Sequence, residues 1–442
     1  MTEAAGNAPL FSFLDEESSV SKSVLRIVAG MMLLLVACSR NVTLTIVPSP
    51  TPTSPSPTHL PQPTASPLPP NKVGIHLLLD DGRNMWPETI WSQHLSYARD
   101  LVGEWGYVTE LVRLDDLDPA RWQVLFDLCA RLHLKPILRL ATSYDSSKGM
   151  WLAPQADPDG DYATVAGRYA RFVAALRWPD TPHYVIVGNE PNHGDEWGGK
   201  ADPLAYTRFL VTTSRALHQA DPDVRVLNAP LDPFTPNTNG MPFTDGMTYL
   251  DAESFLDAMH AAQPDVFASV DIWASHAYPL GPLTEGPWQQ SFKIDLLNGA
   301  QNPNHIEPPS GMHNRGVNGY EWELFKLKSY GVRDLPVIIT ETGWRHREST
   351  DPNATDDGRP LPDASTVAQF IDLAFNGNRG RYPQWPTNGW TPWQDDARVM
   401  AVTPFALDGA PKEWGHTNWL QLDREGRVSG VYRMFEVLRS NR

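Results

Sequence analysis

The chain has 442 residues, of which 41% are hydrophobic, and it carries a formal net charge of −16. This length is enough for one large α/β barrel or about two or three average domains, with a sizeable core. The charge excludes nucleic acid as a partner, because phosphate binding needs clustered Lys and Arg side chains.

The first 38 residues have the pattern of an export signal. Lys22 and Arg26 precede an apolar run over residues 27–37, which is too short to span a bilayer as a helix but fits a signal peptide. The closing Leu35-Val36-Ala37-Cys38 resembles the lipobox of bacterial lipoproteins, which are cleaved before the cysteine and acylated on it. The resemblance implies lipidation of Cys38, export and anchoring to the membrane at the cell surface. The alternatives are a plain signal peptide and an uncleaved anchor.

Residues 39–71 predict a linker between this signal and the folded body. Ten of the 23 residues from 48 to 70 are proline, interleaved with Ser and Thr. Such a segment does not form a packed core and favours an extended polyproline II chain, at about 3.1 Å per residue. We therefore assign residues 1–38 to the signal, 39–71 to the linker and 72–442 to a single folded domain.

Within the folded domain, short β-branched runs alternate with amphipathic helical stretches. The predicted strands are 73–79, 107–113, 135–141, 184–188, 224–228, 269–275, 336–340 and 398–404. The predicted helices are 88–101, 119–134, 162–178, 203–219, 252–262, 320–330, 364–375 and 430–439. This α/β alternation favours a single (β/α)8 TIM barrel with enlarged βα loops. A doubly wound open sheet is the alternative, but no glycine-rich phosphate loop follows the first strand.

Two glutamates lie at the ends of predicted strands, where parallel α/β barrels place their chemistry. Glu190 follows the fourth strand in Asn189-Glu190-Pro191, and Glu341 follows the seventh. Pro191 prevents the strand from continuing past the first of them. Hydrolysis of a glycosidic bond requires two carboxyl groups at one crevice. One donates a proton, and the other, ionised, attacks the anomeric carbon or activates water.

Asn189-Glu190-Pro191 after a fourth strand and Glu341 after a seventh resemble the clan A glycoside hydrolases, which are retaining (β/α)8 enzymes, over residues 73–442. The resemblance implies that Glu190 is the acid/base and that Glu341 is the nucleophile. It also implies that Asn189 contacts the 2-hydroxyl of the sugar.

Further matches to this clan stand at two other strand ends. Ser275-His276-Ala277-Tyr278 is similar to the His-x-Tyr of family 5, which implies a hydrogen bond from Tyr278 to the nucleophile. Arg113, ending the second strand, matches an arginine that steadies the same carboxylate. The third strand ends in Leu138-Arg139-Leu140-Ala141, without the histidine of many family 5 enzymes, so families 39 and 128 stay open.

Two aromatic candidates have both a functional and a structural interpretation. His276 either contacts the sugar or is a hydrogen-bonded histidine at the barrel rim. Trp414, after the eighth strand, either forms a sugar platform or packs. Five further tryptophans are predicted to pack in the walls: Trp344, Trp385, Trp390, Trp393 and Trp419.

No metal or cofactor is predicted. The spacing of His193, Asp195 and Glu196 matches no zinc motif. Residues 157–161 lack the glycine and glutamate positions of a calcium-binding EF-hand loop. Cys129 falls in a predicted helix, so it is expected to be buried and inert.

These observations together predict a retaining glycoside hydrolase that cleaves a β-linked polysaccharide or oligosaccharide by double displacement, as a monomer. A pentose-specific β-xylosidase or arabinofuranosidase is an alternative, as is a non-catalytic glycan-binding surface lipoprotein. We expect Arg113 and Tyr278 to lower the pKa of Glu341, and burial near another carboxylate to keep Glu190 protonated. That pairing predicts a mildly acidic pH optimum.

Overall fold

The computed structural model describes residues 71–348 and 361–440. The described residues belong to the unit Pro67–Arg442. The predicted signal, the lipobox at Cys38 and all of the linker except residue 71 lie outside this part of the chain. None of the helices among the described residues is both long and apolar enough to cross a membrane.

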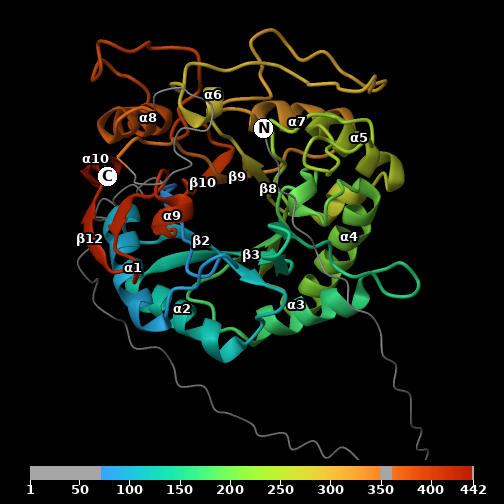
Figure 1. Ribbon diagram of the computed structural model, residues 1–442, viewed down its shortest axis with the longest axis horizontal. Coiled ribbons are helices and arrows are strands. Elements are labelled where there is room, and N and C mark those ends of the chain that lie inside the picture. The colour runs from blue at the N-terminus through green and yellow to red at the C-terminus, as the bar shows by residue number, and fades with distance from the viewer. Residues whose placement is uncertain (1–70, 349–360, 441–442) are drawn as a thin grey trace, which may run out of the picture. The chain divides into compact units, whose positions relative to one another are not determined.

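Eight parallel strands follow one another in chain order, with helices around their outside (Figure 1). Five strands pair in one sheet: β1 (Gly74–His76), β2 (Gly106–Arg113), β3 (Leu134–Ala141), β6 (His183–Val187) and β7 (Val224–Asn228). Three pair in a second sheet: β8 (Trp273–His276), β9 (Val337–Glu341) and β10 (Val399–Val402).

The ring of strands is not closed by continuous pairing, which differs from the regular barrel that the sequence predicts. A single parallel bridge joins the sheets at each seam, Leu227 with Ile272 and Val73 with Val402. At the first seam the side-chain amide of Asn228 replaces the backbone ladder: it accepts from the N–H of Ala274 at 2.8 Å and donates to its carbonyl at 3.0 Å. The eight strands therefore keep barrel order with two weakly paired seams.

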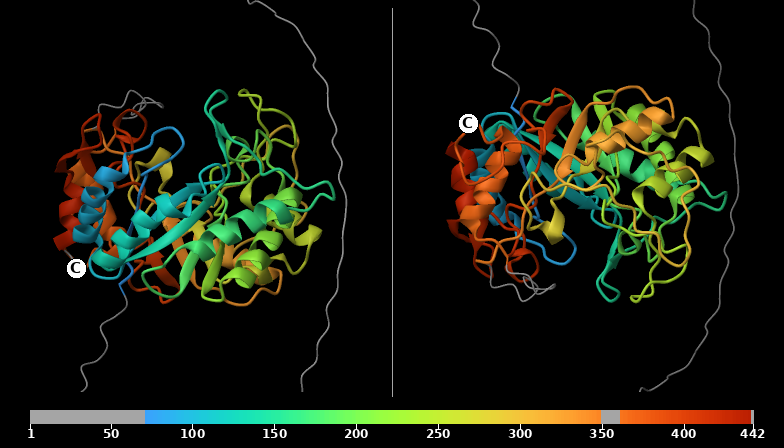
Figure 2. Two further views of the ribbon diagram at one scale, coloured as in Figure 1. Left: turned by 90° about the horizontal axis from the view of Figure 1, so that it is seen from below. Right: turned by 90° about the horizontal axis from the view of Figure 1, so that it is seen from above.

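A helix follows each strand: α1 (Glu88–Val102), α2 (Pro119–Leu132), α3 (Ala163–Ala175), α4 (Pro203–Ala220), α5 (Ala252–Ala262), α7 (Tyr320–Ser329), α8 (Ala364–Asn376) and α10 (Arg433–Ser440). Shorter elements lie in the loops: β4 (Tyr144–Asp145), β5 (Met150–Trp151), η1 (Gly194–Glu196), η2 (Val266–Ser269), α6 (Leu280–Leu283), α9 (Pro411–Trp414), β11 (Leu420–Leu422) and β12 (Val428–Val431). In the side views of Figure 2, long loops following the strands rise on one side of the sheets.

The predicted strand–helix alternation is confirmed in the described part, but several boundaries are wrong. The first strand ends at His76 rather than residue 79, and the third helix ends at Ala175 rather than residue 178. Two further errors concern where an element begins. The sixth strand begins at Trp273 rather than residue 269, because the 3-10 helix Val266–Ser269 precedes it. The last helix begins at Arg433 rather than residue 430, because Val428–Val431 pairs with Leu420–Leu422 as a small antiparallel sheet. Both errors fall where an apolar stretch fits helix and strand equally well.

Side chains of alternate strand positions fill the interior, and the others pack against the helices. The inner cluster includes Tyr107, Ile137, Tyr184, Ala274 and Ile338, one from each of five strands. This alternation follows from the two-residue period of a strand. The predicted packing of Trp344, Trp393 and Trp419 is confirmed by their burial, as is that of Cys129, whose pKa burial raises. Trp385 and Trp390 are half-buried against the same outer core.

Candidate active site

Glu190 reaches the strand ends through an unusual backbone conformation. After β6 ends at Val187, Gly188 has a φ of +94° and Glu190 itself a φ of +32°, which is a strained conformation for a residue with a side chain. The N–H of Glu190 donates to the carbonyl of Pro230 at 3.0 Å, which ties the segment to the next strand end. The buried Tyr206 hydroxyl fixes both strand ends, because it accepts from Ala229 N at 2.6 Å and donates to Val187 O at 3.1 Å.

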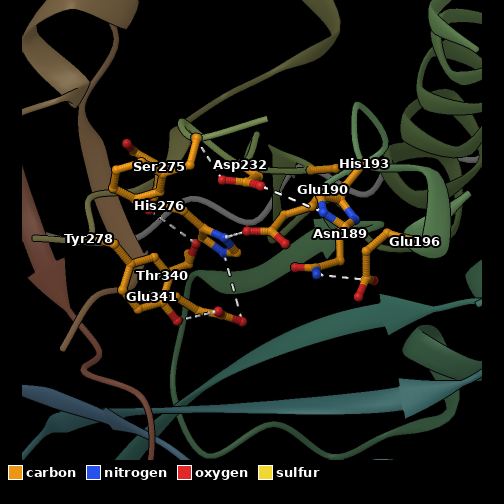
Figure 3. Close-up of polar contacts among 12 residues, drawn as sticks. Asn189, Glu190, His193, Glu196, Asp232, Ser275, His276, Tyr278, Thr340 and Glu341 are labelled. Atoms are coloured by element: carbon orange, nitrogen blue, oxygen red, sulfur yellow. Dashed lines mark hydrogen bonds and ion pairs between the residues drawn. The ribbon is translucent and has the colours of Figure 1, made fainter. Parts of the chain in front are cut away.

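Glu341 owes its direction to a bulge in β9. Ile338 pairs with Ala274, and both lie in the inner cluster, so strict alternation would turn Glu341 away from the interior. The register shifts after Ser275, leaving Thr340 as the extra residue and pairing Glu341 with His276. Bulges of this kind re-aim side chains next to active sites. The two glutamates consequently face each other across the strand ends (Figure 3).

An arginine holds Glu341, but it is Arg139 rather than Arg113. The Arg139 guanidinium, on β3, forms an ion pair with Glu341 and donates to Asn189 Oδ1 at 2.9 Å. The prediction for Arg113 is wrong: its guanidinium pairs with the buried Asp80 and with Asp115. Arg139 lies two positions beyond the inward-facing Ile137, so strand periodicity could have identified it.

Two further groups surround the Glu341 carboxylate. The Tyr278 hydroxyl donates to Glu341 Oε2 at 2.8 Å, and His76 Nε2 lies 3.5 Å from Glu341 Oε1. Burial raises the pKa of a carboxyl group, but here His276, Arg139, His76 and the Tyr278 hydrogen bond outweigh burial and lower the pKa of Glu341 to about 2. Of these neighbours, only Arg139 carries a charge at every working pH. Burial lowers the pKa of His76 to about 3. No sequence motif indicated His76 as a site residue.

His276 links the two glutamates. Its Nδ1 is 2.5 Å from Glu190 Oε1 and its Nε2 is 3.7 Å from Glu341 Oε1, and its side chain is fully buried. Burial lowers the pKa of His276, so the imidazole is neutral and shares a proton with Glu190. His276 does not line the pocket. The structure thus supports the hydrogen-bonded histidine at the barrel rim rather than the sugar contact, and it shows that this histidine bridges the two glutamates.

Glu190 is in the opposite electrostatic situation to Glu341. Burial, followed by the nearby carboxylates Asp232 and Glu341, raises the pKa of Glu190 well above its ordinary value. His193 opposes this rise from the loop after Glu190. The pKa values of the two glutamates are therefore shifted in opposite directions, and two carboxyl groups with pKa values pushed apart are the pattern of an acid and a nucleophile.

Asn189 is held at both ends of its amide. Besides accepting from Arg139, it donates through Nδ2 to Glu196 Oε2 at 3.2 Å. Burial, with the nearby Glu190 and Asp195, raises the pKa of Glu196 to about 8. Glu196 is thus a third, mostly protonated carboxyl group at this site. In the sequence, Glu196 stands out only as part of a spacing that matches no zinc motif.

His193 is the cation of the loop after Glu190. Burial opposes its protonation, but the hydrogen bond to Asp195 and the charges of Asp195 and Asp232 raise the pKa of His193 to about 9. Its Nε2 is 3.9 Å from Asp232 Oδ2. Over residues 71–348 and 361–440, no three His, Cys, Asp or Glu side chains are arranged to hold a metal ion.

These groups open onto one pocket of about 330 Å³. Its lining combines carboxyl groups, two arginines and apolar side chains: Leu78, Asp81, Arg83, Leu111, Arg139, Trp151, Asn189, Glu190, Glu196, Asp232, Phe234, Tyr278, Leu283, Glu341, Phe405 and Trp414. Four predicted residues besides Glu341 are thus brought together, namely Glu190, Asn189, Tyr278 and Trp414. A pocket with a few converging polar groups among apolar ones is the usual form of a small-ligand site.

No family model and no curated protein matches the chain. Among solved structures, a family 39 glycoside hydrolase from Bacteroides cellulosilyticus is 14% identical, with 84% of this chain covering 63% of that one and a TM-score of 0.46. A glucosidase from Croceicoccus marinus is 12% identical, with 84% of this chain covering 66% of that one and a TM-score of 0.48. A β-glucosidase from Exiguobacterium marinum is 11% identical, with 84% of this chain covering 98% of that one and a TM-score of 0.44. The chain spans less than two thirds of the first two proteins. With TM-scores below 0.5, these likenesses carry no functional conclusion.

The ion pair between Arg139 and Glu341 predicts a coupling that depends on pH. In a double-mutant cycle of Arg139→Gln and Glu341→Gln, we expect a coupling free energy of about 1–3 kcal/mol at pH 7, from urea unfolding. A lowered folded-state pKa stabilises the protein above the unfolded value of 4.5, and the stabilisation is lost as pH falls toward 2. The coupling should decline over that window.

Arg113→Gln is the matched control, since this arginine pairs with Asp80 instead. Its coupling to Glu341→Gln should stay below about 0.5 kcal/mol at every pH. Equal coupling for the two arginines would contradict the charge assignment.

Proposed function

We propose that this protein is a retaining glycoside hydrolase acting on β-linked glycans. The observation that carries the proposal is the pair of glutamates at one pocket with His276 between them. Glu341 is held by Arg139 and Tyr278, which favour its ionised form, whereas burial and Asp232 favour the protonated form of Glu190. General acid catalysis needs a carboxyl group that is still protonated at the working pH, and nucleophilic attack needs one that is not. Both conditions are met by neighbouring groups rather than by solvent.

In the proposed first step, a Glu341 oxygen attacks the anomeric carbon while Glu190 donates its proton to the departing glycosidic oxygen. This forms a glycosyl ester on Glu341 and releases the alcohol. Esterification removes the charge of Glu341, which is one of the causes of the raised pKa of Glu190. The pKa of Glu190 therefore falls in the intermediate, which suits it to remove a proton from the incoming water. The hydroxide adds to the anomeric carbon, and Glu341 leaves as a carboxylate.

The neighbouring groups keep Glu341 aimed and charged for attack. Tyr278 and Arg139 each bind one of its two oxygens. Asn189 is positioned by Arg139 on one side and by Glu196 on the other, which leaves little freedom in its amide. An amide fixed beside the reacting carbon suits a sugar hydroxyl, because pre-positioned donors and acceptors lower the cost of ordering the substrate.

A non-catalytic glycan-binding protein is the principal competing interpretation. Burying two carboxyl groups together raises the energy of the pocket unless one of them is protonated. A binding module gains nothing from that arrangement, since hydroxyl groups are bound equally well by amides. The opposite pKa shifts of the two glutamates therefore favour an enzyme over a binding protein.

Substitution of the two glutamates tests the proposal. We expect Glu341→Gln to lose at least 10³-fold in kcat on an aryl β-glycoside, because the nucleophile is gone. Glu190→Ala should lose less on a substrate with a good leaving group, and added azide should restore turnover by attacking the glycosyl ester. Azide should leave Glu341→Gln inactive. Full activity of Glu341→Gln, or net inversion seen by NMR of the first product, would contradict the retaining mechanism.

The pH dependence of kcat/KM provides a second test. Activity should fall at high pH as Glu190 loses its proton and at low pH as Glu341 gains one, which gives a mildly acidic optimum. Asp232 raises the pKa of Glu190 and His193 lowers it. Asp232→Asn should therefore move the alkaline limb to lower pH by roughly one unit and His193→Gln should move it to higher pH. Shifts of both variants in the same direction would contradict this assignment.

We also infer that the enzyme is exported, anchored by a lipid on Cys38 and active as a monomer on a polysaccharide or oligosaccharide at the cell surface. The lipobox-like sequence before Cys38 and the proline-rich linker support the anchoring. Cys38→Ala should move the protein from the membrane fraction to the soluble one. Unchanged fractionation would contradict the anchor.

A further inference from the structure

Arg83 occupies the loop after β1 and lines the same pocket as the two glutamates. Its guanidinium lies between two aromatic rings, 4.8 Å from the centroid of Tyr144 and 5.2 Å from that of Trp414. Its Nε donates to the Tyr144 hydroxyl at 3.2 Å. Cation–π contacts on a planar guanidinium fix its orientation. The two terminal nitrogens are therefore presented together, although the residue as a whole is exposed.

Asp81 fixes the position of Arg83 and Trp414 through hydrogen bonds. Its Oδ1 accepts from the backbone N–H groups of Arg83 at 3.0 Å and Asn84 at 2.7 Å. Its Oδ2 accepts from the indole N–H of Trp414 at 2.6 Å. One buried carboxylate thus fixes both the loop that carries Arg83 and one of the rings beside it. Trp414 therefore helps to hold the Arg83 guanidinium in place. The sequence alone could not distinguish this role from that of a sugar platform.

Within the described part of the chain, Arg83 has no carboxylate partner, unlike the other arginine of the pocket. The Arg139 guanidinium is already bound to Glu341 and Asn189. For Arg83, no carboxylate oxygen of residues 71–348 or 361–440 lies within 4.0 Å of a guanidinium nitrogen. An arginine held in place but unpaired at a ligand pocket is suited to a ligand anion, because its fork matches the two oxygens of a carboxylate or sulfate.

The carboxyl groups of the pocket do not repel such an anion as strongly as their number suggests. Glu190 and Glu196 are protonated at mildly acidic pH, since burial raises the pKa of each. Glu341 is neutralised by Arg139, and Asp232 lies beside the protonated His193. The remaining carboxylate of the lining, Asp81, accepts hydrogen bonds from three N–H groups.

We propose that Arg83 binds the acid group of an anionic sugar, either a uronic acid carboxylate or a sulfate ester, in the glycan that the enzyme cleaves. This inference rests on the proposed hydrolase function and narrows its substrate class. Arg83 acts as a specificity-determining residue, and Tyr144, Trp414 and Asp81 position it. The glutamates perform the same bond cleavage on either kind of sugar.

The test compares matched aryl glycosides on the full-length enzyme. The probes are 4-nitrophenyl β-glucuronide, 4-nitrophenyl 6-O-sulfo-β-glucoside and the neutral 4-nitrophenyl β-glucoside, together with the galacturonide and galactoside pair. We expect the wild type to show a higher kcat/KM for an acidic member than for its neutral partner. In Arg83→Gln the ratio of acidic to neutral kcat/KM should fall about tenfold to a hundredfold, as expected for loss of a charge-assisted bond. Arg83→Lys should retain part of the preference.

Arg131→Gln serves as the control, because this exposed arginine of α2 does not line the pocket; its ratio should not change. A response of the uronide or of the sulfated glycoside identifies which acid group is bound. A wild-type preference for the neutral partner, or an equal loss on both partners in Arg83→Gln, would overturn the inference. Failure to hydrolyse any of these glycosides would instead contradict the proposed hydrolase function.

Discussion

Two carboxyl groups buried at one pocket cannot both ionise without compensating cations, and the rest of this site is arranged around that constraint. Arg139 keeps its proton at any working pH, so the glutamate beside it carries the charge. Glu190 has Asp232 as a neighbour instead, and remains protonated. The difference between the two glutamates therefore lies in the side chains that neighbouring strands direct toward them. Removing Arg139 would therefore reduce the difference between the pKa values of the two glutamates.

Local irregularities of the backbone bring these groups together. The extra residue at Thr340 turns Glu341 toward His276, and the positive φ of Glu190 turns its side chain toward the same ring. Each departure from regular structure costs on the order of 1–3 kcal/mol. The surrounding strand ends offset that cost, since Tyr206 joins the carbonyl of Val187 to the N–H of Ala229. The strained segment is thus hydrogen-bonded to the regular strands on either side of it.

The strand–helix alternation could be predicted because each unit has its own hydrophobic period, and Glu190 and Glu341 because each follows a strongly β-branched run. Arg139 could also have been found, since it continues the inward-facing positions of β3 from Ile137. The prediction for Arg113 was wrong because a residue at a strand end can turn toward either neighbouring loop. The Arg113 side chain turns toward Asp80 and forms an ion pair with it. The bulge at Thr340 and the side-chain bridge by Asn228 depend on pairing between distant strands, which a single sequence does not encode locally.

The loops carry the residues that we propose select the substrate. Arg83, Tyr144 and Trp414 come from three separate segments, and the hydrogen bond from Trp414 to Asp81 spans 333 positions. Contacts of that separation are invisible to any local pattern. Among the described residues, none of the three forms a hydrogen bond or ion pair with Arg139 or Glu341. We therefore expect a change in these loops to alter sugar preference more than the protonation of the glutamates. A scaffold that fixes charge at its strand ends and selects substrate in its loops allows the two properties to vary independently.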